Sequence, residues 1–201
     1  MVDVFVQTDL PIRCETTDHQ LILGRRGTGK THLIKFFQYK TLERGGIAYY
    51  SDCTNYGSGQ FSATADPLAM AAKYFVALLN DVGTALLDHA VRLEAPSSGI
   101  QDKVFVQLTE GLVSFMRPAE SKADSIFNYR QIADALRNIL EGLGIARFFL
   151  ILDEWAQIPI VAQPLVAEFV KRALLTVPAV SVKILAVNYQ CKFSSPLKNS
   201  S

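Results

Sequence analysis

One short stretch near the N-terminus constrains the fold of this chain more than any other part of its sequence. Residues 24–31 read Gly-Arg-Arg-Gly-Thr-Gly-Lys-Thr and fully match the phosphate-binding pattern G-x-x-x-x-G-K-[ST]. Residues 20–23 before it are predicted to form a short buried strand, and residues 31–42 after it a helix. A glycine-rich turn with a chance lysine would not need this strand–loop–helix order, which phosphate binding requires.

The loop holds the residue types that phosphate binding needs. Glycines let the backbone turn its N–H groups toward phosphate oxygens, and the N-terminus of the following helix adds partial positive charge. We expect Lys30 to reach the β- and γ-phosphates and the Thr31 hydroxyl to ligate Mg²⁺. Arg25 and Arg26 either add charge near the phosphates or face solvent. The predicted nucleotide-binding set is Gly24, Arg25, Arg26, Gly27, Thr28, Gly29, Lys30, Thr31 and His32.

The composition is typical of a folded domain with balanced charge. Of the 201 residues 49% are hydrophobic, enough for one domain with a real core. The 20 Lys+Arg and 19 Asp+Glu nearly cancel, which does not indicate nucleic acid or an anionic membrane as a partner, although nucleic acid stays open for a longer parent protein. The chain begins without a signal-peptide pattern, and its uninterrupted apolar runs are too short to span a bilayer, so we expect a cytoplasmic protein.

Three further strands are predicted, at residues 47–51, 148–152 and 182–187. The second is a continuous apolar run, as expected for a strand buried on both faces of a parallel sheet. The three cysteines are far apart, which favours reduced, buried thiols over a disulfide framework or a zinc site. These cysteines are Cys14, Cys53 and Cys191.

Helices are predicted between the strands. One begins at Pro67, with Asp66 as its N-cap, and runs toward Leu93 with a break near Gly83. A regular apolar stripe lies in residues 132–143, and a last helix starts at residues 163–164. Residues expected to face the core from the first and last helices are Leu33, Ile34, Phe37, Leu42, Leu165, Phe169, Val170 and Leu174.

The alternation of strands and helices indicates an α/β fold with a parallel sheet and helices on both faces. Two β–α–β units flank a mostly helical block, at about residues 54–146, that is too long for a plain crossover. We interpret this block as an insertion or a helical lid. Its apolar stripes are expected to belong to the core rather than to a groove for a partner.

A second chemical signature follows the strand at 148–152. Asp153 and Glu154 come directly after it, and ligands of open α/β sheets bind beyond the carboxyl ends of the strands. Asp153 is therefore expected near the phosphate-binding loop, where it can hold the Mg²⁺ shell. Glu154 is placed to accept a proton from the water that attacks the γ-phosphate. Asn188, after strand 182–187, either orients that water or is a simple turn residue, and Trp155 is expected to be a packing residue.

The chain resembles the ASCE division of P-loop ATPases in the order of three features. These are a phosphate-binding loop, an apolar strand ending in Asp-Glu and a polar residue after the next strand. The chain is most similar to origin-recognition-type AAA+ and STAND-type ATPases of prokaryotes, over about residues 20–55 and 145–193. The resemblance implies a three-layer αβα sandwich with a mostly parallel sheet of the 5-1-4-3-2 type. The strand before Asn188 would then lie between the phosphate-loop strand and the Asp153 strand.

The family usually continues with an arginine finger, a fifth strand and a small helical lid, and none is recognisable before Ser201. We therefore expect residues 1–201 to form a single P-loop ATPase domain that is incomplete at its C-terminus, so that the fifth strand can be absent.

For function, the resemblance implies ATP and Mg²⁺ as ligands. It also implies a molecular switch that acts on a protein partner or on a second copy of the chain. Lys30, Glu154 and Asn188 would be catalytic, with Thr31 and Asp153 at the metal. Without an arginine finger, hydrolysis by these residues alone is expected to be slow or absent.

Two other functions stay open. One is a small-molecule or nucleotide kinase, although the adjacent Asp-Glu pair favours water as the acceptor. The other is a module that holds ATP without turnover. A GTPase is disfavoured, because the chain has no Asn-Lys-x-Asp motif for reading the base.

Overall fold

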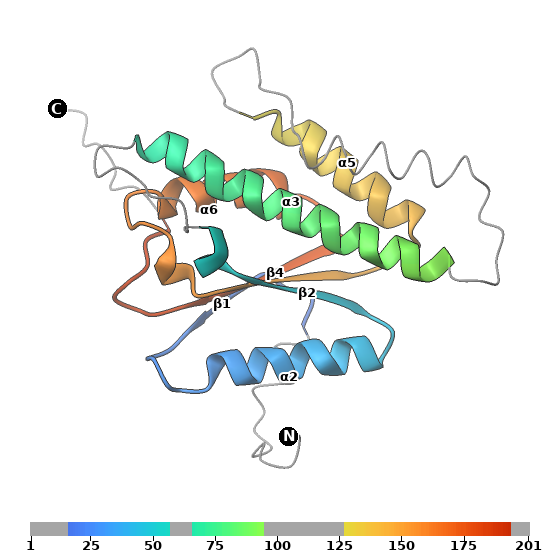
Figure 1. Cartoon of the computed structure of the whole chain (residues 1–201), viewed down its shortest axis with the longest axis horizontal. Coiled ribbons are helices and arrows are strands. Elements are labelled where there is room, and N and C mark those ends of the chain that lie inside the picture. The colour runs from blue at the N-terminus through green and yellow to red at the C-terminus, as the bar shows by residue number, and fades with distance from the viewer. Residues whose placement is uncertain (1–15, 57–65, 95–126, 194–201) are drawn as a thin grey trace.

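A computed structural model describes residues 16–56, 66–94 and 127–193 of the chain (Figure 1). Its four strands form one sheet in the order β1-β4-β3-β2, with all three pairings parallel. This arrangement confirms the predicted α/β class, the parallel sheet, and the place of the last strand between the other two. The strands are β1 (Gln20–Leu23), β2 (Ile47–Asp52), β3 (Phe148–Asp153) and β4 (Val180–Ala186).

Helices cover both faces of the sheet, which gives three layers. Helix α2 (Lys30–Glu43) lies on one face, below the sheet in Figure 1, and the other described helices lie on the opposite face. That opposite layer consists of α3 (Pro67–Glu94), α5 (Tyr129–Gly142) and α6 (Gln163–Ala173). Two short 3-10 turns, η1 (Cys53–Tyr56) and η2 (Trp155–Gln157), follow β2 and β3 closely.

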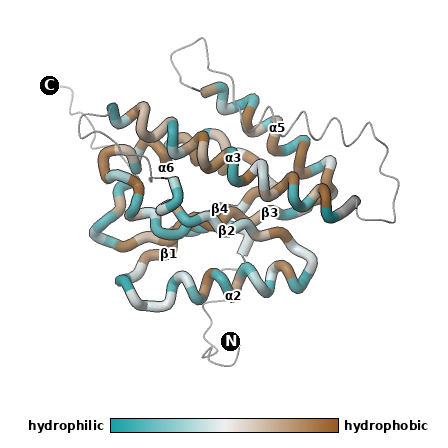
Figure 2. Tube along the Cα trace, in the orientation of Figure 1, coloured by the Kyte–Doolittle hydropathy of each residue, from teal (hydrophilic) through white to brown (hydrophobic). Residues whose placement is uncertain are grey.

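Strand β3 is buried along its whole length, as predicted from its continuous apolar run. Successive side chains of a strand point to opposite faces. Phe148, Leu150 and Leu152 accordingly pack in the core beneath α3, α5 and α6. Phe149 and Ile151 pack on the other face against α2. Figure 2 shows hydrophobic residues along the strands and on the helices that cover them.

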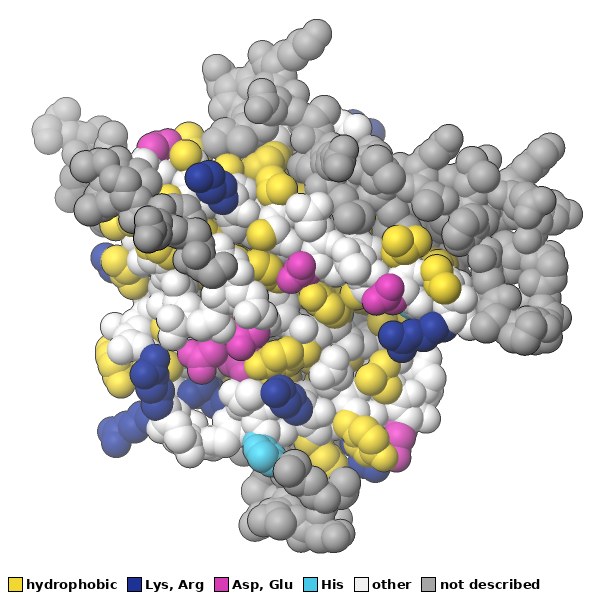
Figure 3. Space-filling model, viewed as in Figure 1, with side chains coloured by type: hydrophobic (Ala, Val, Ile, Leu, Met, Phe, Trp, Pro, Cys, Tyr) yellow, Lys and Arg dark blue, Asp and Glu magenta, His cyan; other side chains and the backbone are white. Residues whose placement is uncertain are grey.

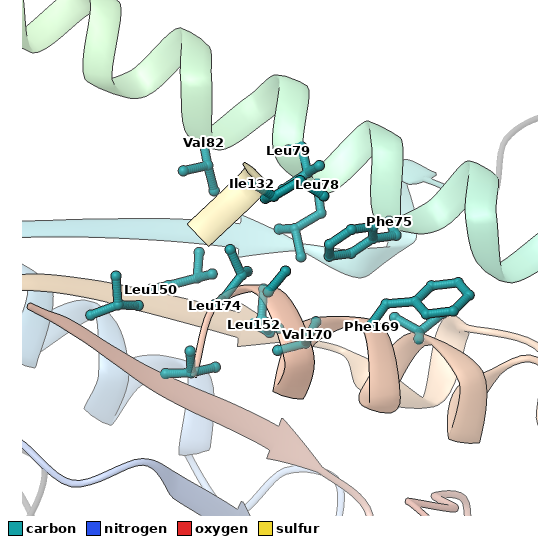
Figure 4. Close-up of a cluster of buried hydrophobic side chains, with 14 of the residues drawn as sticks. Phe75, Leu78, Leu79, Val82, Ile132, Leu150, Leu152, Phe169, Val170 and Leu174 are labelled. Atoms are coloured by element: carbon teal, nitrogen blue, oxygen red, sulfur yellow. The ribbon is translucent and has the colours of Figure 1, made fainter. Parts of the chain in front are cut away.

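The larger core lies between the sheet and the three-helix layer. Figure 4 shows Phe75, Leu79 and Val82 of α3 above Leu150 and Leu152 of β3, with side chains of α5 and α6 completing the cluster. The apolar stripes of the described part of the helical block are thus core, as predicted. Helix α3 starts with Asp66 as its cap, since the carboxylate accepts hydrogen bonds from Leu68 N at 3.3 Å and Ala69 N at 3.1 Å.

The predicted break near Gly83 is wrong. Helix α3 is a continuous helix of 28 residues. Val82 and Leu86 on either side of Gly83 are fully buried, so packing against the core holds a helix whose local propensity for glycine is poor.

Three predictions of burial are also wrong. Leu42, near the end of α2, is 53% exposed, because the sheet is already covered by Leu33, Ile34 and Phe37 of the same helix. Leu21 and Leu23 of β1 are 46% and 45% exposed. Strand β1 is an edge strand of the described sheet and pairs only with β4. Half of its side chains are therefore exposed to solvent.

Helix α3 contains a window, Pro67–Arg92, that is long and apolar enough to cross a bilayer by length and composition alone. Polar residues interrupt it, so it contains no long apolar run of the kind that the sequence prediction considered. Half of the window is buried inside the fold, and buried helices of folded cores pass the same test. The buried residues of the window pack against the sheet and α6, which accounts for its hydropathy.

Candidate functional site

A pocket of about 500 Å³ opens beside the N-terminus of α2, at the carboxyl ends of β3 and β4. Three segments line it, residues 26–32, 153–156 and 185–187. The predicted phosphate-binding loop and the predicted acidic pair therefore meet in one cavity. Figure 3 shows acidic and basic side chains close together on the left of the molecule, over the loops at this end of the sheet.

The loop between β1 and α2 has a backbone that depends on glycine. Gly27 and Gly29 have φ of 78° and 79°, a left-handed conformation that other residues adopt only with strain. Gly24 N donates to Ala186 O at 3.2 Å, which joins the start of the loop to the end of β4. The Thr28 hydroxyl donates to Arg25 O at 2.8 Å and closes the turn.

Lys30 lies across the inside of this loop. Its Nζ donates to Gly24 O at 2.9 Å and to Arg25 O at 2.8 Å. Both partners are neutral carbonyls, so the ammonium charge is not cancelled by a carboxylate in these contacts. A phosphate oxygen would form a stronger, charge-assisted hydrogen bond with the same ammonium.

Thr31 and Asp153 make direct contact. The Thr31 hydroxyl donates to Asp153 Oδ2 at 2.8 Å, although the two residues are 122 positions apart in the chain. Asp153 is only 2% exposed, and its other oxygen, Oδ1, accepts from the backbone N of Glu154 at 2.8 Å. These contacts leave a buried carboxylate beside a hydroxyl at the floor of the pocket.

A third donor to the same carboxylate, Tyr50 on β2, was not identified from the sequence. Its phenol donates to Asp153 Oδ2 at 2.7 Å. Burial and the hydrogen bond to Asp153 raise the pKa of Tyr50, so the phenol remains a neutral donor. The alternation of β2 gives Tyr50 a definite face of the strand, but the pairing of Tyr50 with Ile151, which brings it to the face of Asp153, is not encoded in a local pattern.

Glu154 lines the pocket in an unusual conformation. Its φ of 53° is the only positive value of a non-glycine residue in the described ranges. Such strain is more common at functional sites than elsewhere. Trp155, the next residue, is fully buried and stacks on Phe193 with ring centroids 5.4 Å apart. This packing agrees with the role predicted for Trp155, although part of Trp155 also lines the pocket.

Asn188 lies outside the group that lines the pocket. Strand β4 ends at Ala186, one residue earlier than predicted, and Asn188 is exposed in the turn that follows. Its carbonyl accepts a weak hydrogen bond from Cys191 Sγ at 3.7 Å. Gly24 and Arg25 flank the pocket without lining it, whereas all other residues of the predicted nucleotide-binding set line it.

A buried amide joins the two loops on this side of the site, and the sequence analysis did not identify it. Gln163, at the start of α6, donates from Nε2 to Ile158 O at 2.9 Å and to Gln190 O at 3.1 Å. Its Oε1 accepts from the backbone N of Lys192 at 2.6 Å. The side chain therefore fixes the turn after β4 to the segment after β3.

The oxygen atoms of Thr31 and Asp153 suit a small, hard cation. The described residues contain no group of three or more His, Cys, Asp or Glu that could hold a metal by themselves. Mg²⁺ does not need such a group, because it is commonly bound through one or two protein oxygens together with water and substrate phosphates. A hydroxyl and a carboxylate in contact beside the predicted phosphate-binding loop fit that pattern.

Comparison with known proteins gives no family for this chain: no protein-family model matches it, and no curated protein does either.

Proposed function

We propose that this chain is an ATP-binding domain of the P-loop type, which hydrolyses ATP with Mg²⁺ and works as a molecular switch. The main support is the hydrogen bond of 2.8 Å between Thr31 and Asp153. It joins the two sequence motifs that a nucleotide-hydrolysing site requires, and it does so inside a pocket of about 500 Å³. The β1-β4-β3-β2 order is the order that the resemblance implies without a fifth strand.

Each residue has a definite part in this proposal. The loop N–H groups and Lys30 hold the phosphates, while Thr31 and Asp153 hold Mg²⁺, which neutralises charge on the phosphate oxygens. Glu154 accepts the proton of the attacking water. Asn188 is a candidate for orienting that water. It lies in an exposed turn outside the pocket lining, so this role has less support than the roles of Lys30, Thr31, Asp153 and Glu154.

A module that binds ATP without turnover is the second candidate. Arg26 is the only arginine among the described residues that line the pocket, and an arginine that stabilises the transition state can supply about 10³–10⁵ of the rate. A kinase has less support. Arg137 pairs with Asp134 at 2.7 Å, Arg147 donates to Pro178 O at 2.6 Å, and neither lines the pocket.

As a switch, the domain would act on a protein partner or on a second copy of itself. The bound nucleotide would change the loops at the carboxyl end of the sheet, because these loops form the pocket. We propose that the contacts of these loops with the partner differ between the nucleotide-bound and nucleotide-free states.

The proposal is tested by replacing Lys30 with alanine and measuring Mg·ATP binding by calorimetry. The Lys30→Ala variant is expected to lose about 10- to 100-fold in affinity, since a hydrogen bond to a charged group is lost. Lys40→Ala is the matched control, because Lys40 lies on the same helix and pairs with Glu43 away from the pocket. Equal ATP affinity of the wild type and Lys30→Ala would refute the function.

Phosphate release by the wild type and by a Glu154→Gln variant separates the two candidates. Release by the wild type that falls in Glu154→Gln supports the hydrolysing switch. Tight binding of ATP without phosphate release supports the module that only holds the nucleotide.

A further inference from the structure

We propose that Tyr50 is a positioning residue for the candidate metal site, whose phenol keeps the Asp153 carboxylate oriented toward the pocket. This inference rests on the proposed function and extends it to a residue outside both motifs. Tyr50 touches Asp153, so it acts through that carboxylate.

The carboxylate of Asp153 is held at both oxygens. Oδ1 accepts from Glu154 N at 2.8 Å, and Oδ2 accepts from the hydroxyls of Thr31 at 2.8 Å and Tyr50 at 2.7 Å. Thr31 belongs to the first turn of α2, next to a loop that has to accommodate the nucleotide. Tyr50 belongs to β2, which pairs with β3 along six registered positions. Tyr50 is therefore the side-chain donor that is fixed to the sheet rather than to the loop.

The ring of Tyr50 is itself held in place. It packs beside the core cluster between the sheet and α2. Lys35 Nζ lies 5.1 Å from the ring centroid, a distance typical of a cation–π contact. With its ring held by these contacts, the phenol reaches Asp153 without having to be ordered when a ligand binds.

The neutrality of the donors matters for a cation. No lysine or arginine of the described residues forms a salt bridge with Asp153. A basic partner would cancel the carboxylate charge and compete with the metal, whereas two hydroxyls and a backbone N–H stabilise the charge and leave it uncancelled. Hydrogen-bond partners of metal-binding carboxylates orient them in this way, and their loss commonly costs about 10- to 100-fold in metal affinity.

The test compares Tyr50→Phe with Tyr49→Phe. The first variant removes only the hydroxyl and keeps the ring against α2. The second makes the same change on the neighbouring residue of β2, whose ring packs against the core on the opposite face of the sheet. ATP binding is measured by calorimetry twice, once with EDTA and once over a range of Mg²⁺ concentrations.

For Tyr50→Phe we expect unchanged affinity for metal-free ATP and a half-saturating Mg²⁺ concentration raised about 10- to 100-fold. Tyr49→Phe is expected to behave as the wild type in both titrations. An unchanged Mg²⁺ dependence in Tyr50→Phe would overturn the role of Tyr50. A shift in Tyr49→Phe as large as that in Tyr50→Phe would overturn it too. So would a loss of affinity for metal-free ATP in Tyr50→Phe as large as its loss with Mg²⁺.

The proposed function fails in a different way. Wild-type protein that binds ATP no better with Mg²⁺ than with EDTA would refute the metal site itself, and the role of Tyr50 with it. A wild type with clear Mg²⁺ dependence beside an unaffected Tyr50→Phe would refute the role of Tyr50 alone.

Discussion

The described helices cover the two faces of the sheet unequally. One face is covered by α2 and packs through a cluster of seven buried residues taken from that helix and three strands. The other face is covered by α3, α5 and α6, whose cluster includes most of the buried residues of the chain that the structure describes. Thr31, Tyr50 and Asp153, the residues of the candidate metal site, meet on the thinly covered face.

We infer from this difference that one face contributes most of the stability of the fold and the other carries the residues of the candidate site. The face under α3, α5 and α6, here the thick face, fixes the strands. The face under α2, here the thin face, carries a few polar groups at the strand ends beside the pocket. Alternate side chains of β3 serve the two faces. Leu150 and Leu152 enter the large core, while Ile151 and then Asp153 face α2. Functional groups on such a rigid scaffold are held more precisely than on loops alone.

The largest effect is expected from a cavity in the thick face. Phe75 is fully buried and contacts Phe127 and Phe169, with ring centroids 5.3 and 5.6 Å away. Phe75→Ala is expected to lower the free energy of unfolding by about 3–5 kcal/mol, measured by urea denaturation. The fraction of Phe75→Ala that remains folded should bind Mg·ATP with the affinity of the wild type.

The corresponding change in the thin face sharpens the comparison. Phe37 packs edge-on against Phe149 at 5.1 Å and fixes α2 to the sheet. Phe37→Ala should destabilise the protein and also weaken nucleotide binding, because α2 carries Lys30 and Thr31. Weakened binding in both variants, or in Phe75→Ala alone, would contradict the separation of the two faces.

The next largest effect concerns catalysis. Glu154→Gln is expected to keep ATP binding and to slow phosphate release at least ~10²-fold, because the amide cannot accept the proton of the attacking water. Glu168→Gln on α6 serves as the control, since Glu168 is exposed and lies outside the pocket. Turnover that is the same in both variants would mean that Glu154 is a solvated acid without a catalytic role.

Much of this site was accessible from the sequence because its parts are local patterns. The loop at 24–31 is specified by contiguous residues, and β3 by an apolar run that ends in two acids. The parallel sheet then brings the carboxyl ends of its strands to one edge. Contact between Thr31 and Asp153 follows from these features and needs no knowledge of the packing in between.

The missed residues depend on pairing that local patterns do not specify. Tyr50 reaches Asp153 only because β2 pairs with β3 in one register. Gln163 looks like an ordinary residue at a helix start, and its role appears only when the chain after β4 folds back beside it. The exposed position of Asn188 follows from β4 ending at Ala186, and strand ends are weakly encoded in an apolar sequence.

The smallest effect is expected at Leu42, where the sequence predicted core and the structure shows surface. Leu42 is 53% exposed near the C-terminal end of α2, beyond the three residues that cover the thin face. Leucine and glutamine have similar helix propensities, so Leu42→Gln changes little except the exposed apolar area. The free energy of unfolding should change by no more than about 0.5 kcal/mol, measured by urea denaturation.

Phe37→Ala supplies the contrast on the same helix, since it removes a buried ring five residues earlier. A loss at Leu42 comparable to the loss at Phe37 would show that another part of the protein covers this end of α2. The face that carries the candidate site would then be thicker than its described residues indicate. A negligible loss would agree with a face that α2 covers, among the described residues, through Leu33, Ile34 and Phe37, beside an open pocket that the polar groups of the site line.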